Sequence, residues 1–307
     1  MITEIKRDLR ENIKGKIAYN EPMKRHTSFC IGGPADIWVE PADSADLKNC
    51  LRFGKERNIP VFIIGGGTNL LVNDNGFEGI VISTQFLSSG RIYYSGQKIC
   101  VTSSVNLAGF LNFCIDRELS GMEFLAGVPG SLGGAVAANA GTRHYEKHDR
   151  RKNIRDFVKE VKVMDYNGET SILDKKKLAI AYEPQGIGNF VILEVKFLLT
   201  KTTRKSILDE YRNFLKKKSA TQELSAPSAG CVFKNPAGFK ESAGELIEKC
   251  GLKGRRAGGA VISEKHANFI VNTGNARAKD VMSLMETIRS EVRHKFGVEL
   301  LLEIKVV

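Results

Sequence analysis

Two glycine-rich runs constrain the fold of this chain more than any other feature of its sequence. In the first, three glycines separate two apolar segments, in the order Ile63-Ile64-Gly65-Gly66-Gly67-Thr68-Asn69-Leu70-Leu71-Val72. The second covers residues 127–141 and has glycine, alanine or serine at ten of its fifteen positions. Glycine lets the backbone come close to its surroundings, because no Cβ stands in between. We therefore expect each run to lie against a flat or bulky ligand, or against another backbone.

Neither run has the spacing of a known phosphate-binding loop. The first is not Gly-x-Gly-x-x-Gly, and it lacks the lysine followed by serine or threonine of a P-loop. A lone glycine turn is usually only a turn, and the second run alone is compatible with close helix packing. Two such runs beside apolar segments favour a large anionic cofactor as the joint explanation. The residues expected to hold it are Gly65, Gly66, Gly67, Thr68, Asn69, Pro129, Gly130, Ser131, Gly133 and Gly134.

The composition is that of an ordinary soluble protein. With 307 residues, of which 42% are hydrophobic, the chain can bury a sizeable core. No stretch reaches the roughly 20 consecutive apolar residues that cross a bilayer. The start of the chain alternates charged and apolar residues and does not resemble a secretory signal. We therefore expect a cytoplasmic protein without membrane insertion.

The cysteines and the net charge narrow the classes of partner. The six cysteines form no Cys-x-x-Cys pair, which favours reduced thiols over a disulfide framework or a metal site. The net charge of +11 favours polyanionic ligands, although charge alone more often reflects a solvated surface. A nucleic-acid binder is the alternative from another class, but no basic stripe interleaved with aromatic residues is present. We expect neither a nucleic-acid partner nor a bound metal.

Changes in pattern divide the chain into three zones, residues 1–85, 86–200 and 201–297, with 298–307 returning to the first. Strands are expected at 35–40, 61–64, 70–72, 79–83, 158–165, 170–173, 190–199 and 298–307, and helices at 43–57, 107–119, 206–217 and 278–296. The pair Asn167-Gly168 suits the positive φ angles of a tight hairpin turn.

Several motifs occur in the order known from one enzyme family. They are Asn20-Glu21-Pro22, His26-Thr27, Gly32-Gly33-Pro34-Ala35-Asp36, the two glycine runs, Ser228-Ala229-Gly230-Cys231-Val232-Phe233-Lys234-Asn235-Pro236, Gly251-Leu252-Lys253-Gly254, and residues 261–272 with Ser263-Glu264-Lys265-His266-Ala267-Asn268-Phe269. Over residues 19–307 the chain resembles the MurB family, the flavoenzymes that reduce UDP-N-acetylglucosamine enolpyruvate during peptidoglycan synthesis. It is similar to the shorter subtype, since the second zone has no tyrosine-bearing insertion.

The resemblance implies a fold, a cofactor and a reaction. The fold would be α+β, with a two-part FAD-binding domain like that of vanillyl-alcohol oxidase (PCMH-type) and a C-terminal α/β domain for the UDP-sugar. FAD would be bound non-covalently, and NADPH would be the co-substrate. The product would be UDP-N-acetylmuramate, and we expect the enzyme to be a monomer.

The resemblance also implies roles for single residues. The family's proton donor is usually a serine, and Cys231 holds that position here. A thiol can serve, because its unperturbed pKa of about 8.5 makes it a stronger acid than an aliphatic hydroxyl. Glu303 matches a second catalytic position, and Tyr182, Lys234 and Asn235 match substrate-binding ones. Considered alone, Cys231 would be a small buried apolar residue, and Glu303 could equally face solvent.

Several further positions depart from the family pattern. Glu183 follows Tyr182 where the family has an arginine for the enolpyruvyl carboxylate, and a carboxylate there would repel the substrate. Either another cation compensates, or the chain is a diverged flavoprotein that acts on a different substrate. Residues 142–148 also depart from the usual loop. At Lys217 and Lys218 the family commonly has arginines, a milder change.

Overall fold

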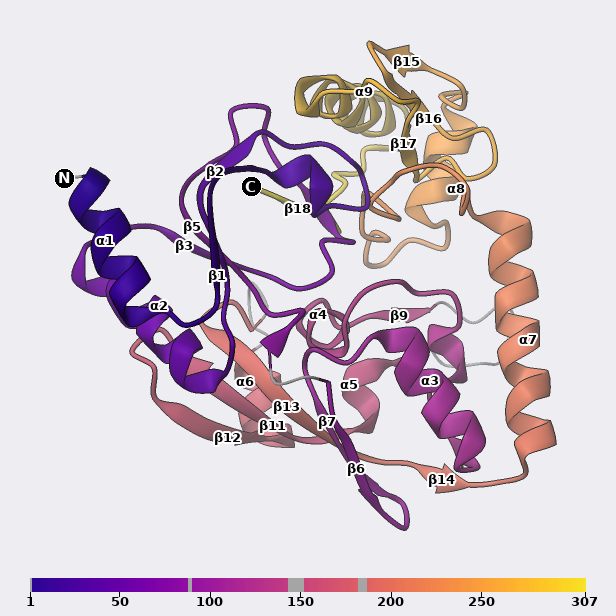
Figure 1. The fold of residues 1–307 in the computed structure, drawn as a ribbon. Helices are drawn as coiled ribbons and strands as arrows, with labels where there is room; N and C mark the ends of the chain where they lie inside the picture. Colours follow the sequence, from indigo (N-terminus) through magenta and orange to yellow (C-terminus); the bar gives the residue numbers. More distant parts are fainter. Residues whose placement is uncertain (1, 88–89, 143–151, 182–186) are drawn as a thin grey trace. The chain divides into compact units, whose positions relative to one another are not determined.

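The computed structural model of the chain describes residues 2–87, 90–142, 152–181 and 187–307 (Figure 1). Contacts divide the chain into two compact units. The first comprises Met1–Tyr19, Ile37–Gly66 and Gly79–Lys216, and the second comprises Asn20–Asp36, Gly67–Glu78 and Lys217–Val307. The first glycine run is therefore shared, since Gly66 belongs to one unit and Gly67 to the other. The sequence pattern did not indicate that residues 20–36 and 67–78 belong to the second unit.

A four-stranded sheet is built from segments in the first third of the chain. Its order is β1-β2-β5-β3, with β1 at Lys16–Pro22, β2 at Pro34–Glu40, β5 at Phe77–Ser83 and β3 at Val61–Ile64. Strands β3 and β5 run parallel. Helices α1 (Ile2–Asn12) and α2 (Ser44–Glu56) lie side by side (Figure 1). Leu9 of α1, Leu47 and Leu51 of α2 and Ile80 of β5 share one core.

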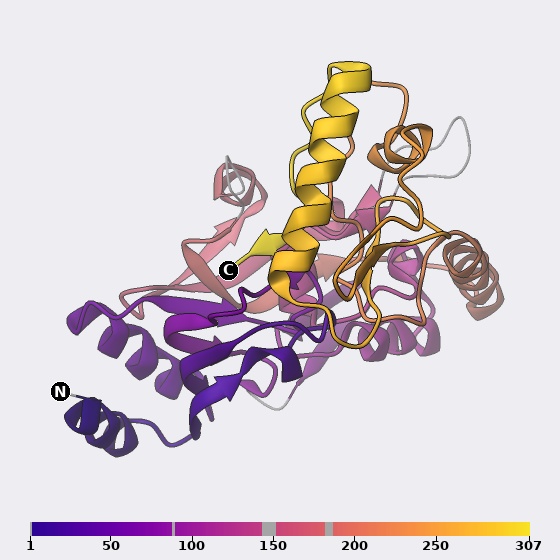
Figure 2. The ribbon, with the colours of Figure 1, turned by 90° about the horizontal axis from the view of Figure 1, so that it is seen from above.

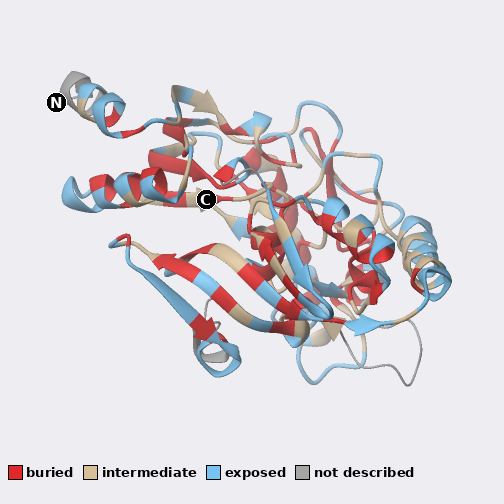
Figure 3. Ribbon diagram, turned by 60° about the horizontal axis from the view of Figure 1, so that its bottom comes forward, coloured by how far each residue is buried: buried red, intermediate tan, exposed pale blue. Residues whose placement is uncertain are grey.

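The first unit also contains a five-stranded antiparallel sheet in the order β12-β11-β13-β7-β6. Its strands are Thr170–Asp174, Val158–Asp165, Phe190–Leu198, Lys98–Thr102 and Ile92–Ser95. Buried residues alternate with more exposed ones along β7 and along parts of β11 and β13, as expected when one face packs on a core, whereas the outer strands β6 and β12 are mostly exposed (Figure 3). That core includes Phe110 of α3 (Leu107–Asp116), whose ring stacks on Phe197 with centroids 5.4 Å apart.

Short elements connect these parts of the first unit. They are β8 (Leu119–Ser120), η3 (Glu123–Leu125), α4 (Leu132–Ala137), β9 (Gly141–Thr142), β10 (Lys152–Asn153), α5 (Ile154–Phe157), α6 (Lys175–Ala181) and β14 (Thr200–Lys201). Helix α4 lies within the second glycine run and contacts β7 and β13.

The second unit is organised around helix α9 (Ala278–Phe296), which packs against β15, β16 and α8 (Figure 2). Its other elements are η1 (Met23–Arg25), β4 (Leu70–Leu71), α8 (Ala243–Lys249), β15 (Arg256–Ala257), β16 (Ala260–Ile262), β17 (Ile270–Asn272) and β18 (Lys305–Val306). Helix α7 (Arg204–Thr221) contains the boundary between the units. The Asp74 carboxylate accepts the Ala278 and Lys279 N–H groups, at 2.8 and 3.1 Å, and so caps α9. Across the described ranges, no helix combines the length and apolar character needed to span a membrane.

Most of the predicted elements are confirmed, and three predictions are wrong in detail. Helix 107–119 ends at Asp116, because Glu118 takes a φ of 56°, which a right-handed helix cannot contain. In the 165–169 hairpin only Gly168 has a positive φ, 79°. Asp165 N–H donates to Glu169 O at 2.9 Å, so the turn holds three residues and needs one glycine rather than a pair with positive φ.

The segment 298–307 is not one continuous strand. Only Lys305–Val306 forms a strand, which pairs in parallel with Leu70–Leu71 of β4. Before it, Leu302 makes an isolated bridge to Phe233. Apolar residues alternate along this segment, but its two parts pair with different segments of the chain. An alternating sequence pattern does not show where one pairing ends and the next begins.

A buried carboxylate fastens the N-terminal arm to the first unit. The Asp46 side chain is 2% exposed. Its two oxygens accept the N–H groups of Lys14, Gly15 and Ala42 at 2.9, 2.8 and 3.0 Å. Replacing Asp46 by alanine would leave these donors unpaired, so we expect the free energy of unfolding to fall by about 2–4 kcal/mol.

Urea denaturation followed by circular dichroism measures this loss. Asn49→Ala is the matched control on the same helix, because Asn49 is exposed and its amide donates only to Asn12 O at 3.0 Å. The control should change the stability by no more than about 0.5 kcal/mol. Equal effects of the two substitutions would contradict the role given to Asp46.

Candidate active site

The two glycine runs meet within the first unit. A Cβ built on Gly66 would stand 2.7 Å from Gly130 Cα, and one on Gly65 would stand 2.7 Å from Ser131 Oγ. Real Cβ atoms do not approach other atoms so closely, so the backbone contact at Gly66 requires glycine, whereas at Gly65 the Ser131 side chain would have to turn. The backbone-against-backbone alternative therefore explains part of the glycine content without any ligand.

The two runs form a cradle, made of residues 65–66 and 130–134, that also offers polar atoms to a ligand. Ser131 caps α4, since its Oγ accepts the Gly134 N–H at 3.2 Å. Gly133 packs on Ser103 and donates its N–H to Ser103 O at 2.9 Å. Ser103 is only 1% exposed, yet its Oγ has no hydrogen-bond partner among the residues that the structure describes. A buried orphan hydroxyl beside a glycine cradle fits a ligand that brings hydrogen-bonding oxygens, such as a diphosphate.

One face of the cradle is open. A Cβ on Gly134 would meet Ser131 Oγ at 3.3 Å and, within the described ranges, no other atom inside 4 Å. Pro129, at the start of the turn, is exposed, and Gly130 has a φ of 110°. The structure thus brings together Gly65, Gly66, Pro129, Gly130, Ser131, Gly133 and Gly134 of the predicted cofactor set.

The remainder of that set, Gly67, Thr68 and Asn69, lies in the second unit. Gly67 has a φ of 62°, and a Cβ there would overlap the carbonyl oxygen of His26. Asn69 Nδ2 donates to Glu303 O at 3.1 Å. A predicted cofactor-binding residue thus holds the backbone of a predicted catalytic one, a link that the sequence did not indicate.

The structure also brings Cys231 and Glu303 together. The segment 231–234 lies between residues 268–269 on one side and 301–303 on the other. On the first side, Cys231 forms a bridge with Phe269. On the second, Glu303 N–H donates to Val232 O at 2.8 Å. The two predicted catalytic residues are therefore neighbours on adjacent, hydrogen-bonded segments.

Burial and charge set the state of the Cys231 thiol. Burial, and then the Glu303 carboxylate, raise the pKa of Cys231 to about 12, while Lys218 acts to lower it. At neutral pH the group is therefore a thiol, suited to giving up a proton rather than to acting as a thiolate nucleophile.

Lys218 is the residue of this group that the sequence analysis missed. It lies on α7, and burial lowers its pKa to about 8, with Cys231 acting in the opposite direction. The sequence showed only that Lys218 stands where the family commonly has arginine. Its proximity to a residue thirteen positions later is a property of the tertiary structure.

The predicted substrate-binding residues have different surroundings. Lys234 is exposed, and its N–H donates to Leu301 O at 2.8 Å. Asn235 Oδ1 accepts the Ala243 N–H at 2.9 Å, at the start of α8. Tyr182 and Glu183 lie outside the described residues, as do residues 143–148 of the departing loop.

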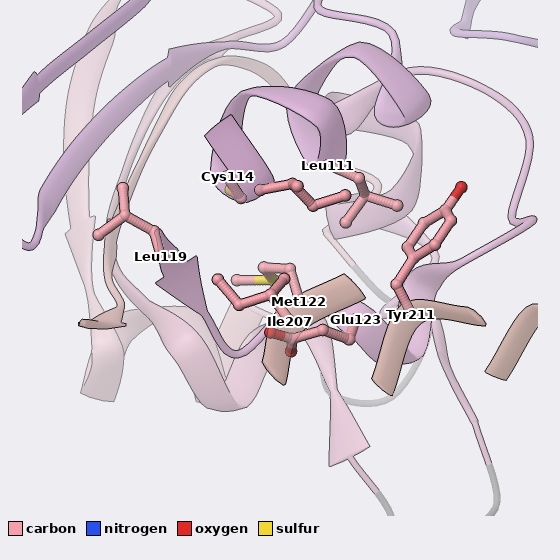
Figure 4. Close-up of a pocket in the computed structure, with 8 residues that line it drawn as sticks. Leu111, Cys114, Leu119, Met122, Glu123, Ile207 and Tyr211 are labelled. Carbon is pink, nitrogen blue, oxygen red and sulfur yellow. The ribbon is translucent and has the colours of Figure 1, made fainter. Parts of the chain in front are cut away.

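A small pocket in the first unit is not this site. It has a volume of about 10 Å³, and Figure 4 shows the Glu123 carboxylate among its apolar lining. Glu123 Oε2 accepts the Gly121 N–H at 2.8 Å. The cavity has room for about one water molecule, and none of the predicted site residues lines it.

Two family models and several curated proteins match this chain. Residues 222–307 match the model of the UDP-N-acetylenolpyruvoylglucosamine reductase C-terminal domain, and residues 35–174 match that of an FAD binding domain. The UDP-N-acetylenolpyruvoylglucosamine reductase of Caldanaerobacter subterraneus subsp. tengcongensis is 39% identical, with 100% of this chain and 98% of that protein covered. The enzyme of that name from Moorella thermoacetica is 37% identical, with 99% and 98% covered.

Solved structures confirm the fold. The crystal structure of UDP-N-acetylenolpyruvylglucosamine reductase (MurB) from Thermus caldophilus matches with a TM-score of 0.76 and 30% identity, covering 96% of this chain and 99% of that one. Berberine bridge enzyme from Eschscholzia californica matches with a TM-score of 0.50 and 16% identity, covering 65% and 44%, which bears on the fold alone. These likenesses confirm the α+β, PCMH-type architecture. The chain therefore belongs to the UDP-N-acetylenolpyruvoylglucosamine reductase (MurB) family of FAD-dependent oxidoreductases.

Proposed function

We propose that the chain reduces UDP-N-acetylglucosamine enolpyruvate to UDP-N-acetylmuramate in the cytoplasm, as a monomer, with NADPH as the reductant. The observation that carries the proposal is the placement of Cys231 on a segment hydrogen-bonded to Glu303, in a chain whose full-length relatives bear this enzyme's name. Those shared names do not favour the alternative of a different substrate.

The glycine cradle is the part of the chain that would hold FAD without a covalent bond. Gly65, Gly66, Gly130 and Ser131 present backbone and hydroxyl groups, and the orphan Ser103 Oγ would gain a partner. FAD held there would supply the hydride transfer between NADPH and the terminal carbon of the enolpyruvyl group. Within the second unit, Asn69 would keep the Glu303 backbone in place.

Cys231 would supply the proton that completes the reaction. Hydride addition leaves negative charge on the carbon next to the substrate carboxylate, and Cys231 Sγ–H would donate to that carbon. Because the thiol pKa is raised to about 12, the donor stays loaded at physiological pH, and the far more basic carbanion can still take its proton. Lys218 would offset the charge that the resulting thiolate adds beside Glu303.

The sugar nucleotide would be held by Tyr182, Lys234 and Asn235. Lys234 is an exposed cation on the segment that carries Cys231, and this suits a diphosphate near the site of proton transfer. The Asn235 amide oxygen is already engaged by α8, so its NH₂ group would make the contact. Glu183 would have to stand away from the enolpyruvyl carboxylate.

Anaerobic visible absorption tests the proposal directly. NADPH should bleach the flavin bands of the purified protein, and UDP-N-acetylglucosamine enolpyruvate should restore them. Bands that bleach but stay bleached would mean that the acceptor is another molecule. Bands that never bleach would exclude NADPH as the reductant.

The pH dependence of reoxidation should reveal Lys218. Since burial lowers its pKa to about 8, Lys218 is a cation below that pH and loses its charge above it. We expect the rate of reoxidation to fall roughly tenfold per pH unit above about 8, as the required protonated form is depleted. Lys218→Arg should move this fall to higher pH, because arginine stays charged.

Lys217→Arg is the matched control, since Lys217 is exposed on the same turn of α7. Its pH profile should coincide with that of the wild type. If the rate of reoxidation of Lys218→Arg still fell above about pH 8, the fall would be due to a group other than Lys218.

A further inference from the structure

A buried asparagine is hydrogen-bonded to the segment that follows Cys231. Asn268 is 3% exposed, and its amide pairs with both main-chain groups of Phe233. Phe233 N–H donates to Asn268 Oδ1 at 2.9 Å, and Asn268 Nδ2 donates to Phe233 O at 2.8 Å. The side chain thereby takes the place of a strand residue. One further bond comes from its own backbone, since Val232 N–H donates to Asn268 O at 2.9 Å.

These hydrogen bonds affect the geometry of the candidate site, because the opposite edge of the same segment is hydrogen-bonded to residues 301–303. Val232 O accepts the Glu303 N–H at 2.8 Å, and Lys234 N–H donates to Leu301 O at 2.8 Å. A shift of Phe233 would therefore change where Cys231 lies relative to Glu303. Among the described residues, no other single side chain hydrogen-bonds to both main-chain groups of a residue in 231–234.

Asn268 is itself held in position. Its N–H donates to His266 Nδ1 at 3.2 Å, and the His266 ring lies 4.8 Å from the Phe269 ring between centroids. Gly244 leaves the room that the imidazole needs, since a Cβ there would stand 3.2 Å from His266 Cε1. The Asn268 backbone is thus held where the side-chain amide meets both main-chain groups of Phe233.

The chemistry of this contact requires asparagine. Aspartate has the same shape and would still accept the Phe233 N–H, but its second oxygen would face the Phe233 carbonyl oxygen and repel it. An apolar residue would leave both buried main-chain groups of Phe233 unpaired. Glutamine is longer by one methylene and could not reach both groups from the same backbone position.

We propose that Asn268 is a positioning residue for Cys231, and that its amide pair with Phe233 sets the approach of the thiol to the carbon that it protonates. The proposal rests on the function proposed above. It predicts that disturbing Asn268 slows the transfer of the proton and leaves the reduction of the flavin by NADPH unaffected.

Anaerobic stopped-flow absorption of the flavin-loaded protein separates the two half-reactions. For Asn268→Asp we expect reoxidation by UDP-N-acetylglucosamine enolpyruvate to be about 10- to 100-fold slower, the cost of a misplacement of the order of 1 Å. Bleaching by NADPH should keep its rate within about twofold, and the loss should fall on kcat more than on KM. The solvent deuterium isotope effect on reoxidation should rise, because proton transfer then limits the rate.

Asn272→Asp is the matched control. Asn272 is a buried asparagine of the same unit, and its side chain makes three hydrogen bonds, to Phe29 O, Gly274 N and Ala276 N, none of them to residues 231–234. It should lower Tm as Asn268→Asp does, yet reoxidise within about twofold of the wild-type rate. Asn268→Ser, whose hydroxyl is too short to reach either Phe233 group, is used if the aspartate variant cannot be purified and should show a loss of similar size.

The outcomes distinguish the positioning role from the function on which it rests. If the wild type itself is not reoxidised by the enolpyruvyl sugar, both proposals fail together. If the wild type is reoxidised and the Asn268 variants match it in rate and isotope effect, only the positioning role is overturned. Equal slowing by the Asn268 and Asn272 variants would also overturn it, since the effect would then be general destabilisation.

Discussion

Replacing Cys231 by alanine is expected to slow reoxidation of the reduced flavin by UDP-N-acetylglucosamine enolpyruvate about 10²–10⁴-fold, the range that a positioned general acid contributes. Reduction by NADPH should keep its wild-type rate, because no proton from Cys231 takes part in that half-reaction. Rapid-mixing absorption under anaerobic conditions measures both rates on one sample.

Two further variants make this expectation specific to the acidic proton. Cys231→Ser restores the residue usual in the family and should recover much of the turnover that alanine loses. Cys250→Ala removes another half-buried thiol of the same unit and should leave both half-reactions at wild-type rates. Normal turnover of Cys231→Ala would show that another group donates the proton, and the role of Cys231 would then be wrong.

Replacing Gly66 by alanine is expected to give a protein that is purified with little or no flavin. The added methyl group would stand 2.7 Å from Gly130 Cα and 3.3 Å from Ser131 N. These are backbone atoms that cannot swing aside, so the two glycine runs must separate and the cradle widens. The ratio of flavin to protein absorbance after gel filtration, and the Kd for added FAD, measure the effect. We expect the affinity to fall at least about 100-fold, which corresponds to roughly 2.8 kcal/mol.

Gly109→Ala is the matched control in the same unit. Gly109 lies in α3, and a Cβ there would have open space around it in the described part of the chain. Alanine should stabilise that helix by about 0.5–1 kcal/mol and leave the flavin content unchanged. Full flavin content in Gly66→Ala would mean that the close approach of the two runs is not required for cofactor binding.

Local features of the sequence determined most of the elements. The apolar stripe of residues 278–296 predicted helix α9 with its observed bounds, because burial every three to four residues is a property of a helix by itself. The helix at 43–57 and the strand at 158–165 were likewise predicted from local patterns. Motif spacing then indicated the family, and with it Cys231 and Glu303. None of these inferences needed to know which segments touch.

Only the tertiary structure decided how these parts form a site. Asn69 and Glu303 are 234 positions apart, yet the side chain of one holds the backbone of the other. Lys218 lowers the pKa of Cys231, and the Asn268 amide hydrogen-bonds to the Phe233 backbone. Neither contact leaves a periodic pattern in the sequence. Likewise, the requirement for glycine at Gly66 comes from Gly130, far along the chain. Secondary structure follows from interactions between near neighbours, which leave a repeating pattern in the sequence. The active site depends on single hydrogen bonds, charges and close approaches between distant segments, and these exist only once the chain has folded.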